Sequence, residues 1–308
     1  MTERKHFLKK MASAVMAAAC AFTIFGAIQA PVNAEAKTTT FTGFYQEGGI
    51  SVTTYGGTVK NVSSTNKKVA TISKNKTISS KADIYFKKAG KATVKIKSKG
   101  YRSSATFTYK FNLKDATSSF APDLQTGVAS SYSTPYFIKL KNNSGINFER
   151  ALIGYTFYDV SGNSVLNNTV NIRNVNAGST AYSDQVFVKN ELNVDPSKTK
   201  IWIAGLERYN ITNNYKTLSK KQYTVNVTPA TNADGYNTYK VTAKNKSRKK
   251  SDISATLILK DANGQIVGSV RKWTFYLKPG NSDSYTFSPM VKSDQIASYD
   301  IVYSAVCY

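Results

Sequence analysis

A group of lysines in and beside a strand-like run contains the residues of this sequence best suited to binding chemistry. They belong to a segment whose charge is almost entirely of one sign. A field of one sign on a compact domain attracts polyanions. The simpler alternative is that these lysines blunt exposed strand edges and keep the protein in solution. The lysines in question are Lys87, Lys88, Lys91, Lys95, Lys97 and Lys99.

A second basic run lies near the carboxyl end of the chain, between two strand-like segments. Its spacing and its Asn and Ser residues favour a solvated hairpin tip, with contacts to several phosphates as the alternative. Its charged members are Lys244, Lys246, Arg248, Lys249 and Lys250.

The amino end has the pattern of a secretory signal peptide over residues 1–36, with an uncleaved transmembrane anchor as the alternative. Basic residues precede an uncharged, Ala-rich run from Met11 to Ala30, and small residues at Ala30, Ala34 and Ala36 offer three cleavage sites. Cleavage would remove His6, the only histidine, and Cys20, one of two cysteines. We therefore expect no imidazole-dependent catalysis, no cofactor and no metal site in the mature chain.

Carboxylates offer little catalytic chemistry either, because nothing in the spacing of Glu149, Glu191 and Glu207 predicts a facing pair. We expect no enzymatic activity. Two Asp-x-x-Gly segments, at Asp159 and Asp261, place oxygens at alternate positions but lack the distal glutamate of a calcium loop. They predict hairpin turns in which Asp bonds its own backbone.

The remaining candidates are aromatic residues and one thiol. Trp202 and Trp273 lie in strand-like runs and are expected to fill cores, although Trp273 is the better candidate for ligand stacking because Arg271 and Lys272 adjoin it. Cys307 is expected to be a buried residue of the final strand, with a cross-linking thiol as the alternative.

These side chains must be positioned by strands, because the hydrophobic period is two almost throughout. The pattern predicts an all-β fold of three tandem immunoglobulin-like β-sandwich domains, at residues 37–114, 115–226 and 227–308. Residues 37–114 hold sixteen Lys and Arg against two acidic residues, a net charge of +14. The basic character therefore belongs mainly to the first domain.

The first domain resembles the group 2 bacterial immunoglobulin-like family. The matching segments are Val62–Asn66, Val69–Ile72, Thr77–Ile78 and Ala89–Val94, with departures at the hairpin Ser73–Lys76 and at a second strand through Ser79–Lys81. The resemblance implies a small Greek-key sandwich used in surface proteins as a spacer, an adhesive or a carbohydrate-contacting module, without catalytic residues.

The rest of the chain repeats itself at a period of about 100 residues. Segment 136–144 aligns with 239–247, segment 155–163 with 257–265, and segment 176–179 with 278–281. The shared turn residues resemble FxLYD-type and related immunoglobulin-like modules of Gram-positive surface proteins.

These patterns together predict a secreted or cell-wall-associated protein that is structural or adhesive. Its basic domain is expected to bind an anionic cell-wall polymer or another polyanion, with a glycan or a host surface protein as other partners. The second hypothesis is a secreted carbohydrate-binding module protein. The mature chain shows no sorting motif and no terminal apolar anchor, so attachment is expected to be electrostatic.

Overall fold

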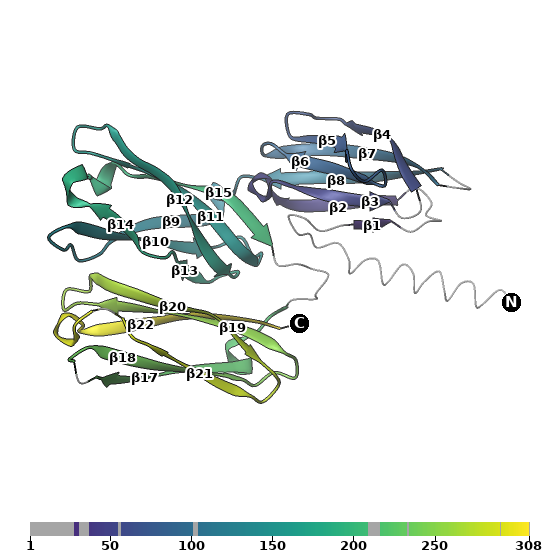
Figure 1. Ribbon diagram of the computed structural model, residues 1–308. Helices are drawn as coiled ribbons and strands as arrows, with labels where there is room; N and C mark the ends of the chain where they lie inside the picture. Colours follow the sequence, from purple (N-terminus) through teal and green to yellow (C-terminus); the bar gives the residue numbers. More distant parts are fainter. Residues whose placement is uncertain are drawn as a thin grey trace. The chain divides into compact units, whose positions relative to one another are not determined.

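The computed structural model describes residues 28–30, 37–54, 57–100, 104–208, 216–232, 234–289 and 291–307. Its elements are β-strands and short 3-10 helices (Figure 1), so the all-β prediction is confirmed. No helix in these ranges is long and apolar enough to span a membrane. Most of the predicted signal peptide, including the cleavage sites at Ala34 and Ala36, lies outside the described residues.

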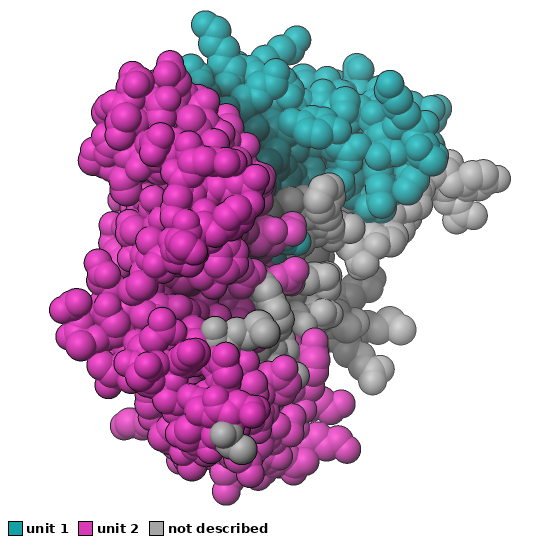
Figure 2. Space-filling view, turned by 60° about the vertical axis from the view of Figure 1, so that its left-hand side comes forward, with its two compact units in different colours: residues 1–116, 205–212 teal, residues 117–204, 213–308 magenta. Residues whose placement is uncertain are grey.

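The chain divides into two compact units, which Figure 2 colours separately. Unit 1 comprises residues 1–116 and 205–212, and unit 2 comprises residues 117–204 and 213–308. The second and third predicted domains thus lie in one unit, and a short segment of the second belongs to unit 1. The three-domain division itself stays a prediction.

Unit 1 is a pair of four-stranded sheets, ordered β1-β3-β6-β5 and β2-β8-β7-β4. Its described residues include the 3-10 helix η1 (Tyr45–Glu47) and the first residue of a second one, η2 (Ala116–Ser118). The strands are β1 (Ile28–Ala30), β2 (Lys37–Phe44), β3 (Gly49–Thr54), β4 (Gly57–Ser64), β5 (Ala70–Lys74), β6 (Lys81–Phe86), β7 (Gly90–Gly100) and β8 (Ser104–Lys114).

The alternation of apolar and polar residues explains why these two sheets face each other. Inward residues of both sheets, such as Val52 and Ile84 on one and Ile96 on the other, are at most 1% exposed and belong to one core. Phe41, Phe86 and Phe111 cluster there, and the centroids of Phe86 and Phe111 are 5.2 Å apart. Burying each such ring contributes about 1.5–3 kcal/mol.

Two details of unit 1 differ from the sequence interpretation. The strand expected through Ser79–Lys81 begins only at Lys81, because residues 78–81 form a turn in which the Lys81 N–H donates to the Ile78 carbonyl. Strand β1 comes from the segment assigned to the signal peptide and pairs in parallel with β3. Cleavage at any predicted site would remove β1 and leave β3 at the sheet edge.

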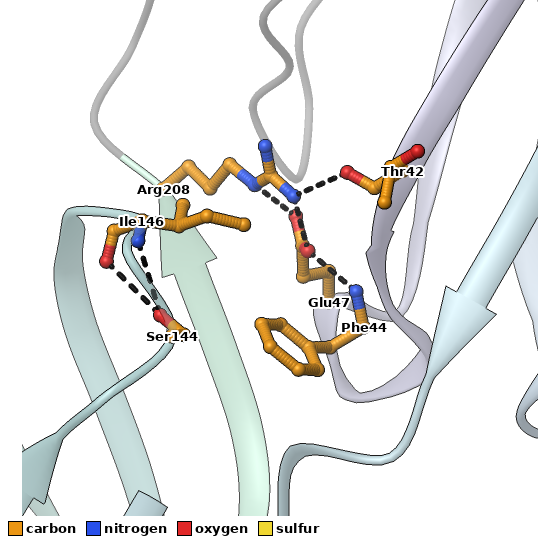
Figure 3. Close-up of polar contacts among 6 residues, drawn as sticks. All are labelled: Thr42, Phe44, Glu47, Ser144, Ile146 and Arg208. Carbon is orange, nitrogen blue, oxygen red and sulfur yellow. Dashed lines mark hydrogen bonds and ion pairs between the residues drawn. The ribbon is translucent and has the colours of Figure 1, made fainter. Parts of the chain in front are cut away.

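A buried ion pair joins two distant parts of the sequence within unit 1 (Figure 3). Arg208 Nε lies 2.5 Å from Glu47 Oε2, and Arg208 Nη2 lies 2.7 Å from Glu47 Oε1. Arg208 also donates to the carbonyl of Thr42 and lies over the Phe41 ring. Only 3% of the Glu47 side chain is exposed.

The environment of Glu47 is strongly constrained. Burial raises the pKa of its carboxyl, whereas the Arg208 guanidinium and the Phe44 N–H act to lower it. A Cβ on Gly43 would lie 2.6 Å from Arg208 Nη2, so only glycine fits beside the pair. The ion pair therefore holds residues near 208 against β2 and η1.

The described residues of unit 2 form four sheets. Strand β10 pairs with β9 and with β13 and β14, and the other orders are β12-β11-β15, β16-β22-β19-β20 and β17-β18-β21. Short 3-10 helices are η3 (Asn190–Leu192), η4 (Pro196–Lys198), η6 (Lys220–Gln222) and η7 (Ser293–Gln295). The strands are β9 (Phe120–Thr126), β10 (Ser133–Asn142), β11 (Phe148–Tyr158), β12 (Ser164–Val175), β13 (Thr180–Tyr182), β14 (Val186–Lys189), β15 (Lys200–Arg208), β16 (Lys216–Thr217), β17 (Tyr223–Thr231), β18 (Asn237–Asn245), β19 (Ser251–Lys260), β20 (Ile266–Leu277), β21 (Ser282–Phe287) and β22 (Ser298–Cys307).

The sheets of unit 2 pack in pairs through aromatic and aliphatic residues. Tyr136 of β10 meets Phe157 of β11 with ring centroids 4.8 Å apart. In the other pair, Tyr239 of β18 and Leu257 of β19 share one core with Cys307. Cys307 is 6% exposed and lies in the final strand, as the sequence predicts.

A second, smaller apolar contact links these two sheet pairs within unit 2. Phe137 packs with Ile258 and Ile266, all at most 4% exposed. Beside them, Arg271 donates to the carbonyl of Tyr182, and its Nη1 lies 3.6 Å from Asp184. This contact explains why the outer faces of β10 and β19 carry apolar residues that one sandwich alone would not bury.

Candidate basic face on strand β7

The lysines of β7 line one exposed face of its sheet. Ala92, Val94 and Ile96 point into the core and are at most 4% exposed. The alternate positions point outward and are exposed, and because a strand rises about 3.3–3.4 Å per residue, neighbouring lysines recur at about 7 Å. These positions carry Lys91, Lys95, Lys97 and Lys99.

Neutral polar side chains and one further lysine lie beside this row on β8 and β2. Across β8, Lys95 is opposite Thr108 and Lys97 is opposite Thr106, while Lys110 is opposite Thr93. The outward positions of β2 add exposed Thr38, Thr40 and Thr42, which pair with Thr108, Lys110 and Asn112. The described outward positions of these strands hold no Asp or Glu. We call this surface the β7 face.

Acidic residues near it in the sequence are engaged elsewhere. Glu47 is in the buried ion pair, and Asp115 accepts a hydrogen bond from Gln46. Asp83 lies in β6, on the opposite sheet, where it accepts hydrogen bonds from Ser51 and Asn75. The positive charge of the β7 face is therefore not compensated by these carboxylates.

The other predicted basic residues lie at two turns. Lys87 and Lys88 are exposed between β6 and β7 and lead directly into the β7 face. Lys244 is the penultimate residue of β18, and the rest of the second basic run connects β18 to β19 in unit 2. All five of its charged side chains are exposed: Lys244, Lys246, Arg248, Lys249 and Lys250.

This second run is held by one buried amide. Asn245 is 0% exposed, and its Nδ2 donates to the carbonyls of Lys249 and Leu277 at 2.7 and 3.0 Å. Its Oδ1 accepts from the Ser247 N–H. The run is therefore an ordered loop, whose lysine and arginine side chains face solvent around a fixed backbone.

The same arrangement recurs one repeat earlier. Asn142, also 0% exposed, donates to the carbonyls of Ile146 and Val175 and accepts from Ser144. These Asn-x-Ser segments are aligned in the repeat, but the sequence alone gives them no role. Their hydrogen bonds show that the aligned asparagines close equivalent connections, after β10 and after β18.

The Asp-x-x-Gly segments form the predicted turns. Asp159 Oδ1 accepts from the Asn163 N–H at 2.8 Å, and Asp261 Oδ1 accepts from the Gln265 N–H at 2.8 Å. The hydrogen bonds that Asp159 accepts from the side chain and the N–H of Asn163 lower the pKa of the Asp159 carboxyl. Gly162 has a φ of 88°, which glycine adopts without strain. In the described ranges, no group of three or more potential metal-ligating residues is close enough to hold a metal ion.

One of the two tryptophans differs from the sequence prediction, and the side chain of the other is outside the described part of the chain. Trp202 was expected in a core, but it is 39% exposed because it lies on the outer face of β15, against Gly154. The side chain of Trp273 lies outside the described residues, although its backbone belongs to β20. Arg271, the expected basic neighbour of a Trp273 site, is instead held by Tyr182 and Asp184.

Comparison with known proteins adds no assignment. No family model and no curated protein sequence matches the chain. The resemblances to bacterial immunoglobulin-like and FxLYD-type modules therefore stay predictions, and function must be argued from the surface chemistry.

Proposed function

We propose that the chain is a non-enzymatic surface or secreted protein whose first domain, of bacterial immunoglobulin-like type, binds an anionic cell-wall polymer through the β7 face. The observation that carries the proposal is the row of exposed lysines on a rigid strand with no acidic residue beside it. A fixed row of charges repels itself unless a ligand or counterions neutralise it. An extended phosphodiester polymer laid along β7 would supply that neutralisation.

The strand geometry favours a polymer over a small anion. Lys95, Lys97 and Lys99 are spaced evenly, so one extended chain can meet all three in sequence. Hydroxyls of Thr106 and Thr108 flank the row and can donate to phosphate oxygens. Replacing condensed counterions by lysines makes such binding depend strongly on salt.

The test uses the chain from residue 37 to 308, because Arg208 belongs to unit 1 and truncation would remove it. Replacing Lys95, Lys97 and Lys99 with glutamine is expected to weaken sedimentation with teichoic-acid-containing walls. The slope of log affinity against log salt should fall by about 2, since each lost contact on a single-stranded polyanion contributes about 0.7.

A control with the same net charge replaces the exposed Lys221, Lys240 and Lys278 of unit 2. It should bind as the unchanged protein does. If both triple variants lose affinity equally, only net charge matters and the β7 face is not a site. Walls stripped of teichoic acid should bind neither the unchanged protein nor either triple variant.

A further inference from the structure

The outer face of the sheet β12-β11-β15 carries an aromatic surface of a different kind. Exposed residues alternate along β15, with Lys200, Trp202 and Ala204 outward and Ile203 buried. Trp202 lies over Gly154 of β11, the central strand. Thr156 and Leu152 flank Gly154 on the same face, because residues two apart in a strand share a side.

The indole of Trp202 lies flat on the sheet. A Cβ added to Gly154 would fall closest to Cε2 of Trp202 and almost equally far from the two neighbouring atoms Cζ2 and Nε1, 2.6 Å from the latter. A point placed so is above the ring, not beside its edge. One indole face therefore covers the glycine backbone, while Trp202 as a whole remains 39% exposed.

Polar, uncharged side chains lie on β12 opposite Gly154 and its two neighbours on this face. On β12, Thr169 is opposite Gly154, Asn171 is opposite Leu152, and Asn167 is opposite Thr156. Amide and hydroxyl groups of this kind donate and accept hydrogen bonds without requiring a charged partner. The charged residues Arg150 and Arg173 face each other further along the sheet.

We propose that this face binds a neutral polysaccharide with flat, β-1,4-linked pyranose units. The apolar C–H face of a pyranose ring stacks on an exposed indole, and its equatorial hydroxyls match amide and hydroxyl groups at the rim. The residues of β12 opposite Gly154 and its neighbours are uncharged, and Lys200, two residues from Trp202, has its ammonium over the Tyr158 ring, so the part of this face beside the open indole favours a neutral ligand over the polyanion of the β7 face.

Trp202 is the open platform of this face. The other outward aromatic residue, Tyr158, has Lys200 Nζ 5.3 Å from its ring centroid, so a cation already occupies one side. Gly154 acts as a positioning residue, since any side chain there would lift the indole from the sheet.

The experiment measures binding of cellohexaose, chitohexaose and maltohexaose to residues 37–308 by calorimetry. It is performed in about 1 M NaCl, where the Debye length is ~3 Å and polyanion binding is screened. At least one β-1,4-linked hexasaccharide is expected to bind. Trp202→Ala and Gly154→Val should each weaken that binding about tenfold or more, which corresponds to about 1.4 kcal/mol.

Phe187→Ala is the matched control, because Phe187 is 65% exposed on β14 of the same unit and should not contribute. Gly154→Val retains the indole, so its loss of binding would separate ring position from ring presence. The proposal is overturned if neither β-1,4-linked sugar binds, if Trp202→Ala binds normally, or if maltohexaose binds equally well. The high-salt assay is independent of the teichoic acid experiment, so either proposal can fail alone.

Discussion

Replacing Arg208 with alanine is expected to destabilise unit 1 by about 3–5 kcal/mol, the usual cost of leaving one member of a buried ion pair without its partner. The Glu47 carboxylate would keep the Phe44 N–H but lose both guanidinium contacts, in a site where its side chain is 3% exposed. Chemical denaturation followed by near-ultraviolet circular dichroism would measure the change.

Two further variants identify the cause of that loss. The double variant Glu47→Met, Arg208→Met should recover most of the stability, because similar-sized apolar residues often replace a buried pair without cost. Lys260→Ala is the surface control, since its partner Asp300 is 57% exposed and such pairs contribute about 0–1 kcal/mol. An equally large loss in Lys260→Ala would contradict the role of burial.

Replacing Asn245 with alanine should produce the second large effect. The buried carbonyl of Leu277 would lose its side-chain donor, and the Ser247 N–H would lose its acceptor. Each buried polar group left without a partner costs about 1–3 kcal/mol, so we expect a total near 3 kcal/mol. Thermal unfolding of unit 2 would report it, and proteolysis at Lys249 and Lys250 should accelerate.

Asn263→Ala provides a matched control for that substitution. Asn263 lies in an exposed turn, where its own N–H, not its side chain, donates to Asp261. We expect a change below about 0.5 kcal/mol there, as for most surface substitutions. Asn142→Ala should resemble Asn245→Ala, because the two amides make equivalent bonds. If Asn142→Ala has no effect, the equivalence of the two connections is only geometric.

Local patterns predicted the strands and turns well. Buried and exposed residues alternate along β7 and β8 because each strand has one face toward the core and one toward solvent. The hydrophobic period of two in the sequence therefore follows directly from burial. The Asp159 and Asp261 turns were equally predictable, since their hydrogen bonds lie within four residues.

Features that depend on distant residues were not predictable in this way. Glu47 and Arg208 are 161 residues apart, and no local pattern marks either as a member of a buried pair. Trp202 was expected in a core because its neighbours in sequence are apolar. Its exposure depends on Gly154 in a neighbouring strand, where the missing side chain leaves room for the indole outside the sandwich.

The return of residues 205–212 to unit 1 has a consequence for the order in which the chain can fold. Arg208 follows Lys114, the end of β8, by 94 residues, so the strands of the amino-terminal sandwich are available to fold before it, whether the chain emerges from the ribosome or from an export channel. Until Arg208 follows, Glu47 has no cationic partner, and the amino-terminal sandwich remains less stable than in the finished protein. That sandwich therefore reaches its full stability only after most of the next segment has emerged.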